Sequence, residues 1–114
     1  MTAASDLGRL LVERPSVLGT RETTLDRVPV GVPVTTTAKI VNIHTLRGRV
    51  CLTLDDGRGG SAFAVVESGR LVKAFQAAGV RPQPGVCVQI RGVVTPPVAK
   101  MTKTIEANVL RVVS

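Results

Sequence analysis

The stretch RVCLTLDDGRGGSAFAVV, residues 49–66, constrains the fold of this chain more than any other segment. Apolar Val50, Leu52 and Leu54 alternate with other residues, which is the period of a β-strand with one buried face. Three glycines and two aspartates follow within residues 55–60, and these residue types allow the chain to reverse tightly. Because the β-like run SAFAVV continues after this turn, the segment predicts a β-hairpin.

Three further segments predict strands around this hairpin. The β-branched run VTTTAKIVNI (34–43) precedes it, and the runs VCVQIRGVVT (86–95) and KTIEANVLRVV (103–113) lie near the C-terminus. The last two runs are separated by PPVAKMT, whose adjacent prolines exclude a central strand there. The chain is therefore expected to contain five strands.

One helix is predicted between the third and fourth strands. In ESGRLVKAFQAAGV, Leu71 and Phe75 have the spacing of one helix face, Ser68 is a candidate N-cap and Gly79 a candidate stop. We expect Phe75 to lie in the core. The predicted order is β-β-β-α-β-β.

Two short pieces of sequence resemble a known family. They are LDDGRG (54–59) and PGVCVQIRG (84–92). Together with the runs VTTTAKIVNI, VCLTLDDGRGGSAFAVV, PGVCVQIRGVV and IEANVLRVV, taken in that order, they look like the anticodon-binding and replication type of OB domain, found in some aminoacyl-tRNA synthetases and in the alpha subunit of bacterial DNA polymerase III. The resemblance covers about residues 34–113. It implies an all-β, five-stranded OB-fold barrel whose helix fills one end and whose second and third strands form a binding face. The chain departs from such domains in having only two aromatic residues, Phe63 and Phe75.

The first 33 residues lack a sustained pattern, so we divide the chain into an N-terminal arm (1–33) and an OB-fold domain (34–114). Two alternatives are open for the arm: Leu25, Val28 and Val30 form an extra edge strand on the barrel, or the arm orders only on assembly. No apolar run is long enough to span a membrane, so we expect a cytoplasmic protein with no membrane partner.

The charge of the chain points to an anionic partner. The formal net charge is +7, and because residues 1–33 carry four arginines and four acidic residues, the whole excess lies in residues 34–114. Lys39 and Thr53 are expected on the outer faces of the first and second strands, and further cations lie in turns and loops. The expected nucleic-acid-binding set is Lys39, Arg47, Arg49, Thr53, Arg58, Phe63, Arg91, Lys100 and Lys103.

Within this set, the connection of the first two strands holds Arg47 and Arg49, and the connection of the last two holds Lys100 and Lys103. We expect these loops and Arg58 to form one basic rim around the binding face. The orientation of Phe63 depends on strand register. If Ala62 and Ala64 face inward, Phe63 lies outside as a platform for a base, whereas a shift of one residue places it in the core.

The sequence offers no catalytic or metal-binding set. His44 is the single histidine, and Cys51 and Cys87 lack CxxC partners, so we predict no metal and no cofactor and take both cysteines as reduced and buried. Asp55 and Asp56 are explained as turn formers. We therefore predict a binding protein and not an enzyme.

The first hypothesis is weakly sequence-specific binding of single-stranded nucleic acid, with DNA favoured over RNA. The alternative is a protein-protein interaction or assembly module, as a homo-oligomer or as an accessory subunit of a replication, transfer or tRNA-handling complex. In that case Val41, Ile43 and Val65 are expected to form an outward apolar patch.

Overall fold

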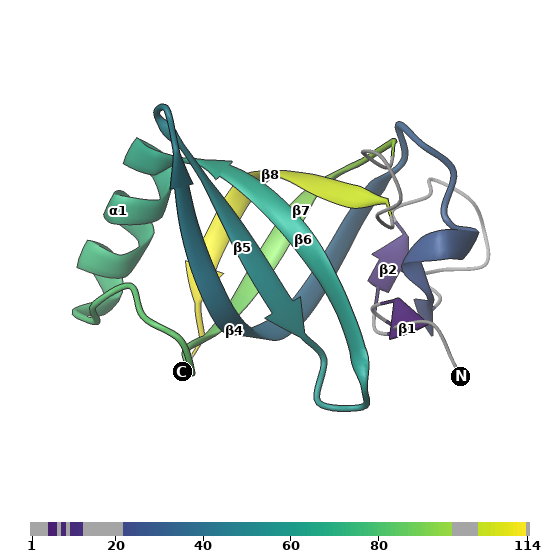
Figure 1. The fold of residues 1–114 in the computed structure, drawn as a ribbon, viewed down its shortest axis with the longest axis horizontal. Helices are drawn as coiled ribbons and strands as arrows, with labels where there is room; N and C mark the ends of the chain where they lie inside the picture. The colour runs from purple at the N-terminus through teal and green to yellow at the C-terminus, as the bar shows by residue number, and fades with distance from the viewer. Residues whose placement is uncertain (1–4, 7, 9, 13–21, 97–102, 114) are drawn as a thin grey trace.

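The computed structural model describes residues 5–6, 8, 10–12, 22–96 and 103–113. The predicted order β-β-β-α-β-β is confirmed, and the strands form a closed five-stranded barrel (Figure 1). Its elements are β4 (Pro33–Leu46), β5 (Arg49–Asp55), β6 (Gly60–Glu67), α1 (Ser68–Ala78), β7 (Cys87–Thr95) and β8 (Thr104–Val112).

The long strand β4 belongs to both halves of the barrel. Residues 33–39 pair with β7 and residues 39–46 pair with β5, both antiparallel, with a register shift between Ile40 and Asn42. Lys39 is the point at which β4 exchanges one neighbour for the other, since it lies opposite both Cys87 and Asp55. The barrel closes where β6 pairs in parallel with β8.

The barrel interior follows the two-residue period of the strands. Val50, Leu52 and Leu54 of β5 are buried as predicted. In β6 the buried side chains are those of Ala62, Ala64 and Val66, so the expected inward set is also correct. Small alanines on one strand face larger aliphatic residues on the next, with Leu52 opposite Ala64 and Leu54 opposite Ala62.

Helix α1 lies at one end of the barrel (Figure 1). Leu71 and Phe75 are buried in the common core, which confirms the prediction for Phe75. The helix ends at Gly79, which has a left-handed φ of 68°, as expected. The N-cap prediction was wrong by one residue: Glu67 is the N-cap, and Ser68 is already helical, with its amide donating to the carbonyl oxygen of Gly48.

The described part of the arm lies at the opposite end of the barrel (Figure 1). It contains β1 (Ser5–Asp6), β2 (Leu10–Val12), β3 (Glu22–Thr23) and a 3-10 turn, η1 (Leu25–Arg27). An extra edge strand does form, but the expected residues were wrong, because β2 is the strand that pairs with β4 at Val34 and Thr35. Leu25 and Val28 are instead buried in the core, and Val30 is exposed.

Gly92 permits an irregularity between β7 and β8. The register shifts between Arg91 and Gly92, and a Cβ atom at Gly92 would lie 2.2 Å from the carbonyl oxygen of Glu106. A side chain cannot be accommodated so close to a backbone atom. Gly92, the last residue of the PGVCVQIRG piece, is therefore required for the close packing of β7 against β8.

Candidate nucleic-acid interface

Phe63 lies on the outer face of the barrel. It is half-buried and opposite Thr53 on β5, and Thr53 is in turn opposite Asn42 on β4. Because its neighbours Ala62 and Ala64 are fully turned into the core, the shifted register with Phe63 inside is excluded. The row Asn42, Thr53 and Phe63 thus combines one aromatic ring with two polar side chains. Asn42 was not singled out from the sequence, because the register shift in β4 decides which of its residues faces outward.

The neighbouring row contains His44, Cys51 and Val65. The two cysteines are free, as expected, but the prediction that they are buried was wrong: Cys51 and Cys87 are half-buried at outward strand positions. They alternate with the core residues Leu52 and Val88, which take the inward positions. Partial burial raises the pKa of the Cys51 thiol, because the charged thiolate is poorly solvated there.

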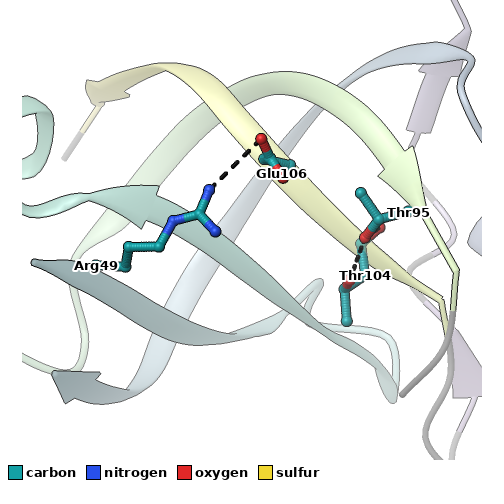
Figure 2. A network of polar contacts seen from close by, with 4 residues as sticks. All are labelled: Arg49, Thr95, Thr104 and Glu106. Carbon is teal, nitrogen blue, oxygen red and sulfur yellow. Dashed lines mark hydrogen bonds and ion pairs between the residues drawn. The ribbon is translucent and has the colours of Figure 1, made fainter. Parts of the chain in front are cut away.

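Arg49 is matched by acidic side chains. Its Nη2 atom lies 3.5 Å from Oε1 of Glu106 on β8, as Figure 2 shows, and Glu67 lies opposite Arg49 on β6. Both members of the ion pair are more than half exposed. The same figure shows Thr95 and Thr104, whose hydroxyl groups are hydrogen-bonded across β7 and β8. Arg49 is therefore on the expected face but shares it with two carboxylates.

Two other predicted cations are exposed in the hairpin turns. Arg47 and Gly48 form the two-residue turn between β4 and β5, with positive φ angles of 30° and 81°. Arg58 is exposed in the turn between β5 and β6. Lys39, also exposed, lies on the outer side of β4 between buried Ala38 and Ile40. These three cations lie at different edges of the Phe63 face.

The two aspartates of the β5–β6 turn organise its backbone. The Asp56 carboxylate accepts hydrogen bonds from the amides of Arg58 and Gly60, at 2.7 and 2.9 Å, and Asp55 accepts one from Gly57 at 2.7 Å. The second Asp56 oxygen accepts the amide of Gly8 from the arm at 3.0 Å. Their assignment as turn formers is thus supported by their hydrogen bonds.

The described cations do not form the expected single basic rim. The β4–β5 turn lies beside α1, whereas β8 begins at the opposite end of the barrel, next to the arm (Figure 1). Lys103 uses its Nζ atom to donate to the carbonyl oxygens of Asp26 and Val28, at 3.1 and 2.7 Å. Arg91 is on β7, away from β5 and β6, and Lys100 lies outside the described residues. The sequence did not reveal that carbonyl oxygens of the arm would accept the hydrogen bonds of Lys103.

Within the described ranges, no cluster of three or more histidine, cysteine or acidic side chains could hold a metal ion. No helix in this part of the chain is long and apolar enough to cross a membrane.

Comparison with solved structures decides the fold family. The chain matches a structure of the S. pombe Stn1–Ten1 complex with a TM-score of 0.58 and 17% identity, over 81% of this chain and 64% of that one. It also matches a Replication Protein A heterotrimer bound to ssDNA, with a TM-score of 0.54 and 19% identity, over 90% and 72%. The protein has an OB fold. A third OB-fold match is an OBody bound to hen egg-white lysozyme, with a TM-score of 0.60 and 16% identity, over 75% and 84%.

These identities relate this OB fold to its neighbours by architecture alone. The chain spans about two thirds of the length of the Stn1–Ten1 chain that it matches. No protein-family model matches the sequence, and no curated protein matches it.

Proposed function

We propose that this OB-fold protein is a non-catalytic binder of single-stranded nucleic acid, with DNA preferred to RNA and with weak sequence specificity. The observation that carries the proposal is the position of Phe63, which is half-buried on the outer face with Thr53 and Asn42 beside it. An aromatic ring in this position can stack on any base, and the two polar side chains can hydrogen-bond to it.

The cations around Phe63 supply the second part of the binding energy. Lys39, Arg47 and Arg58 are exposed at three edges of this face and can contact the phosphates on either side of a stacked base. Their contribution decreases with salt concentration because bound phosphates release counterions. Stacking and phosphate contacts are both independent of sequence, which is why specificity is expected to be weak.

The choice of single-stranded DNA and of the replication type of OB domain is part of the proposal. It is supported by the likeness to the Replication Protein A heterotrimer, which is bound to ssDNA, and by the LDDGRG and PGVCVQIRG pieces. In this protein the first piece forms the turn that follows β5, and the second contains most of β7 and the packed Gly92.

A protein partner is the second candidate function, and exposed aliphatic side chains favour it. Val41 and Leu46 on β4 are 42% and 56% exposed. The expected patch needs correction, since Ile43 packs against the core opposite Leu52 and does not join Val41. The OBody bound to lysozyme shows an OB fold in complex with a protein.

The test is fluorescence anisotropy of labelled oligothymidine, with duplex DNA and RNA of the same length, at two salt concentrations. Phe63→Leu is expected to weaken binding about 10-fold, from loss of stacking, while the salt dependence stays the same. Arg47→Asn keeps a residue that tolerates positive φ and should lower the slope of log K against log salt by about 0.7. Val93→Ala, at a half-buried outward position on β7, is the control and should bind as wild type does.

Two results would overturn the proposal. One is the absence of binding to every oligonucleotide at low salt, which would favour the second candidate function, a protein partner. The other is equal weakening by Phe63→Leu and Val93→Ala, which would place the binding surface elsewhere.

A further inference from the structure

The positive charge of this chain lies mostly outside the part that carries Phe63. Residues 34–67, which contain β5, β6 and nearly all of β4, carry four cations and three acidic residues. Residues 68–114 carry seven cations and a single acidic residue, Glu106. Most of the net charge of +7 therefore belongs to the half of the chain that starts with α1, and binding at Phe63 does not explain it.

Three of these seven cations are set aside. Lys103 donates to carbonyl oxygens of the arm, Arg91 is already engaged in an interaction, and Lys100 lies outside the described residues. The other four are exposed: Arg70 and Lys73 on α1, Arg81 in the segment after it, and Arg111 on β8. The largest group of them is thus on and next to the helix.

The exposed side of α1 forms a basic surface at one end of the barrel (Figure 1). We call it the α1 face, defined by Arg70, Val72, Lys73 and Arg81. The helix itself contains no acidic residue, and Glu67, which precedes it, lies opposite Arg49 on β5. Nη1 of Arg70 donates to the carbonyl oxygen of Asn108 on β8, a neutral acceptor that does not cancel the charge of the guanidinium group.

The side chains of α1 are arranged against the stability of an isolated helix. Arg70 is in the first turn, where the helix dipole disfavours a cation, and this turn has no acidic side chain. Lys73 follows Arg70 by three residues, so two like charges are neighbours on the helix surface. Val72 is 45% exposed, although a β-branched residue lowers helix propensity. An anionic ligand with an apolar side chain would offset the charge repulsion and bury Val72.

The chemistry of the α1 face favours a protein over a nucleic acid as this ligand. Single-stranded nucleic acids bind most tightly where aromatic rings stack on their bases. The α1 face offers the aliphatic Val72 instead, because Phe75, the aromatic residue of α1, is buried in the core. A peptide segment that combines acidic and aliphatic residues complements both the cations and Val72.

We propose that the α1 face binds an acidic segment of a partner protein, with carboxylates against Arg70, Lys73 and Arg81 and an aliphatic side chain against Val72. This inference goes beyond the proposed function and does not depend on it. Helix α1 covers one end of the barrel, whereas Phe63 lies on the outer face of β6. The protein can therefore hold a nucleic-acid strand and a second protein at the same time.

The experiment is fluorescence anisotropy of a labelled peptide of about 15 residues, with two glutamates for every leucine, titrated with the full chain. A second peptide has glutamine in place of every glutamate and should bind far more weakly. Lys73→Gln/Arg81→Gln should weaken binding of the acidic peptide about fivefold, because two ion pairs are lost. Val72→Ala, which suits a helix better, should weaken it about threefold through loss of apolar contact.

The matched control is Arg27→Gln/Arg58→Gln, which removes the same charge from exposed residues. Arg27 is in η1 of the arm, and Arg58 is in the turn that the arm contacts through Gly8, so both lie far from α1. This pair should change the affinity for the acidic peptide by less than about twofold, since distant surface charges are screened by salt. Should Lys73→Gln/Arg81→Gln not fold, Lys73→Gln alone must weaken peptide binding by about twofold.

Oligothymidine separates this inference from the proposed function. Its affinity should be nearly the same for wild type and for Lys73→Gln/Arg81→Gln, and it should not displace the peptide. Displacement together with weaker oligothymidine binding in this variant would assign the α1 face to nucleic acid and overturn the inference. It also fails if the acidic peptide does not bind at low salt, if the glutamine peptide binds equally well, or if both charge-removing pairs weaken binding equally. Absence of oligothymidine binding overturns the proposed function alone.

Discussion

Arg49 on β5 forms an ion pair with Glu106 on β8, across the intervening strand β6, with Nη2 and Oε1 3.5 Å apart. The two side chains are 54% and 56% exposed, so the pair contributes little to stability, about 0.2–1 kcal/mol. Its main effect is on the field at the Phe63 face, where Glu106 offsets the charge of Arg49, one of the cations expected to contact phosphate.

Removing this carboxylate should strengthen nucleic-acid binding. In Glu106→Gln, Arg49 loses its ion-pair partner and only Glu67 lies opposite it, so we expect up to about threefold tighter oligothymidine binding and a salt slope steeper by at most about 0.7. The free energy of unfolding, measured by thermal denaturation, should change by less than about 1 kcal/mol. Asp26→Asn removes the same charge from the arm and is the control. Similar gains in both variants would show that net charge alone is responsible.

The packing of Gly92 leads to a stability prediction. Gly92→Ala should destabilise the barrel by about 3 kcal/mol, because the new Cβ would overlap the Glu106 carbonyl. Gly69→Ala is the matched control: no atom lies within 4 Å of its Cβ position, and it is inside α1. This change should stabilise by about 0.5–1 kcal/mol. Urea denaturation measures both, and a tolerated Gly92→Ala would contradict the close β7–β8 approach.

Lys103 is expected to hold the arm and not the nucleic acid. Lys103→Met keeps the aliphatic part of the side chain but loses the bonds to the Asp26 and Val28 carbonyl oxygens. Loss of these charge-assisted bonds should cost about 1–2 kcal/mol and speed amide hydrogen exchange of Val28. Oligonucleotide affinity and its salt slope should stay at the wild-type level. A reduced slope would instead place a phosphate at Lys103.

The Cys51 thiol predicts a loss of stability at alkaline pH. Its folded pKa is raised by burial above the ordinary value, so the native state retains this proton more tightly than the unfolded chain. The stability from this group is complete below the ordinary thiol pKa and decreases as pH rises through the folded pKa. Urea denaturation at pH 7.5 and pH 10 should show a larger decrease for wild type than for Cys51→Ala. Equal decreases would contradict this effect.

Local patterns were sufficient to predict the barrel strands and the helix. The alternation at Val50, Leu52 and Leu54 and the DDGRGG turn fix the register of the hairpin, and this register places Phe63 outside. Leu71, Phe75 and Gly79 likewise define α1 through helical spacing and a left-handed stop. Each of these signals lies within a few residues of the structure that it specifies.

The parts that sequence analysis missed depend on distant pairs. Arg49 and Glu106 meet only because β6 and β8 pair in parallel, and Lys103 reaches Val28 only because the arm covers that end of the barrel. Neither contact leaves a pattern in the chain. The expectation of one basic rim was wrong for the same reason. Nothing in the local sequence shows that the closed barrel separates the β4–β5 turn from the start of β8.

The parallel contact of β6 with β8 has a further consequence for motion. It consists of two residue pairs, Ala64 with Ile105 and Val65 with Glu106, whereas β5 and β6 pair along their whole lengths. Local opening requires the least free energy where the fewest backbone hydrogen bonds must break. We therefore expect the barrel to open first between β6 and β8. Opening there frees an edge of β6 while the β4–β5–β6 hairpins stay intact. The β4–β5–β6 sheet that carries Phe63 can thus move away from β8 while its own strand pairing stays intact.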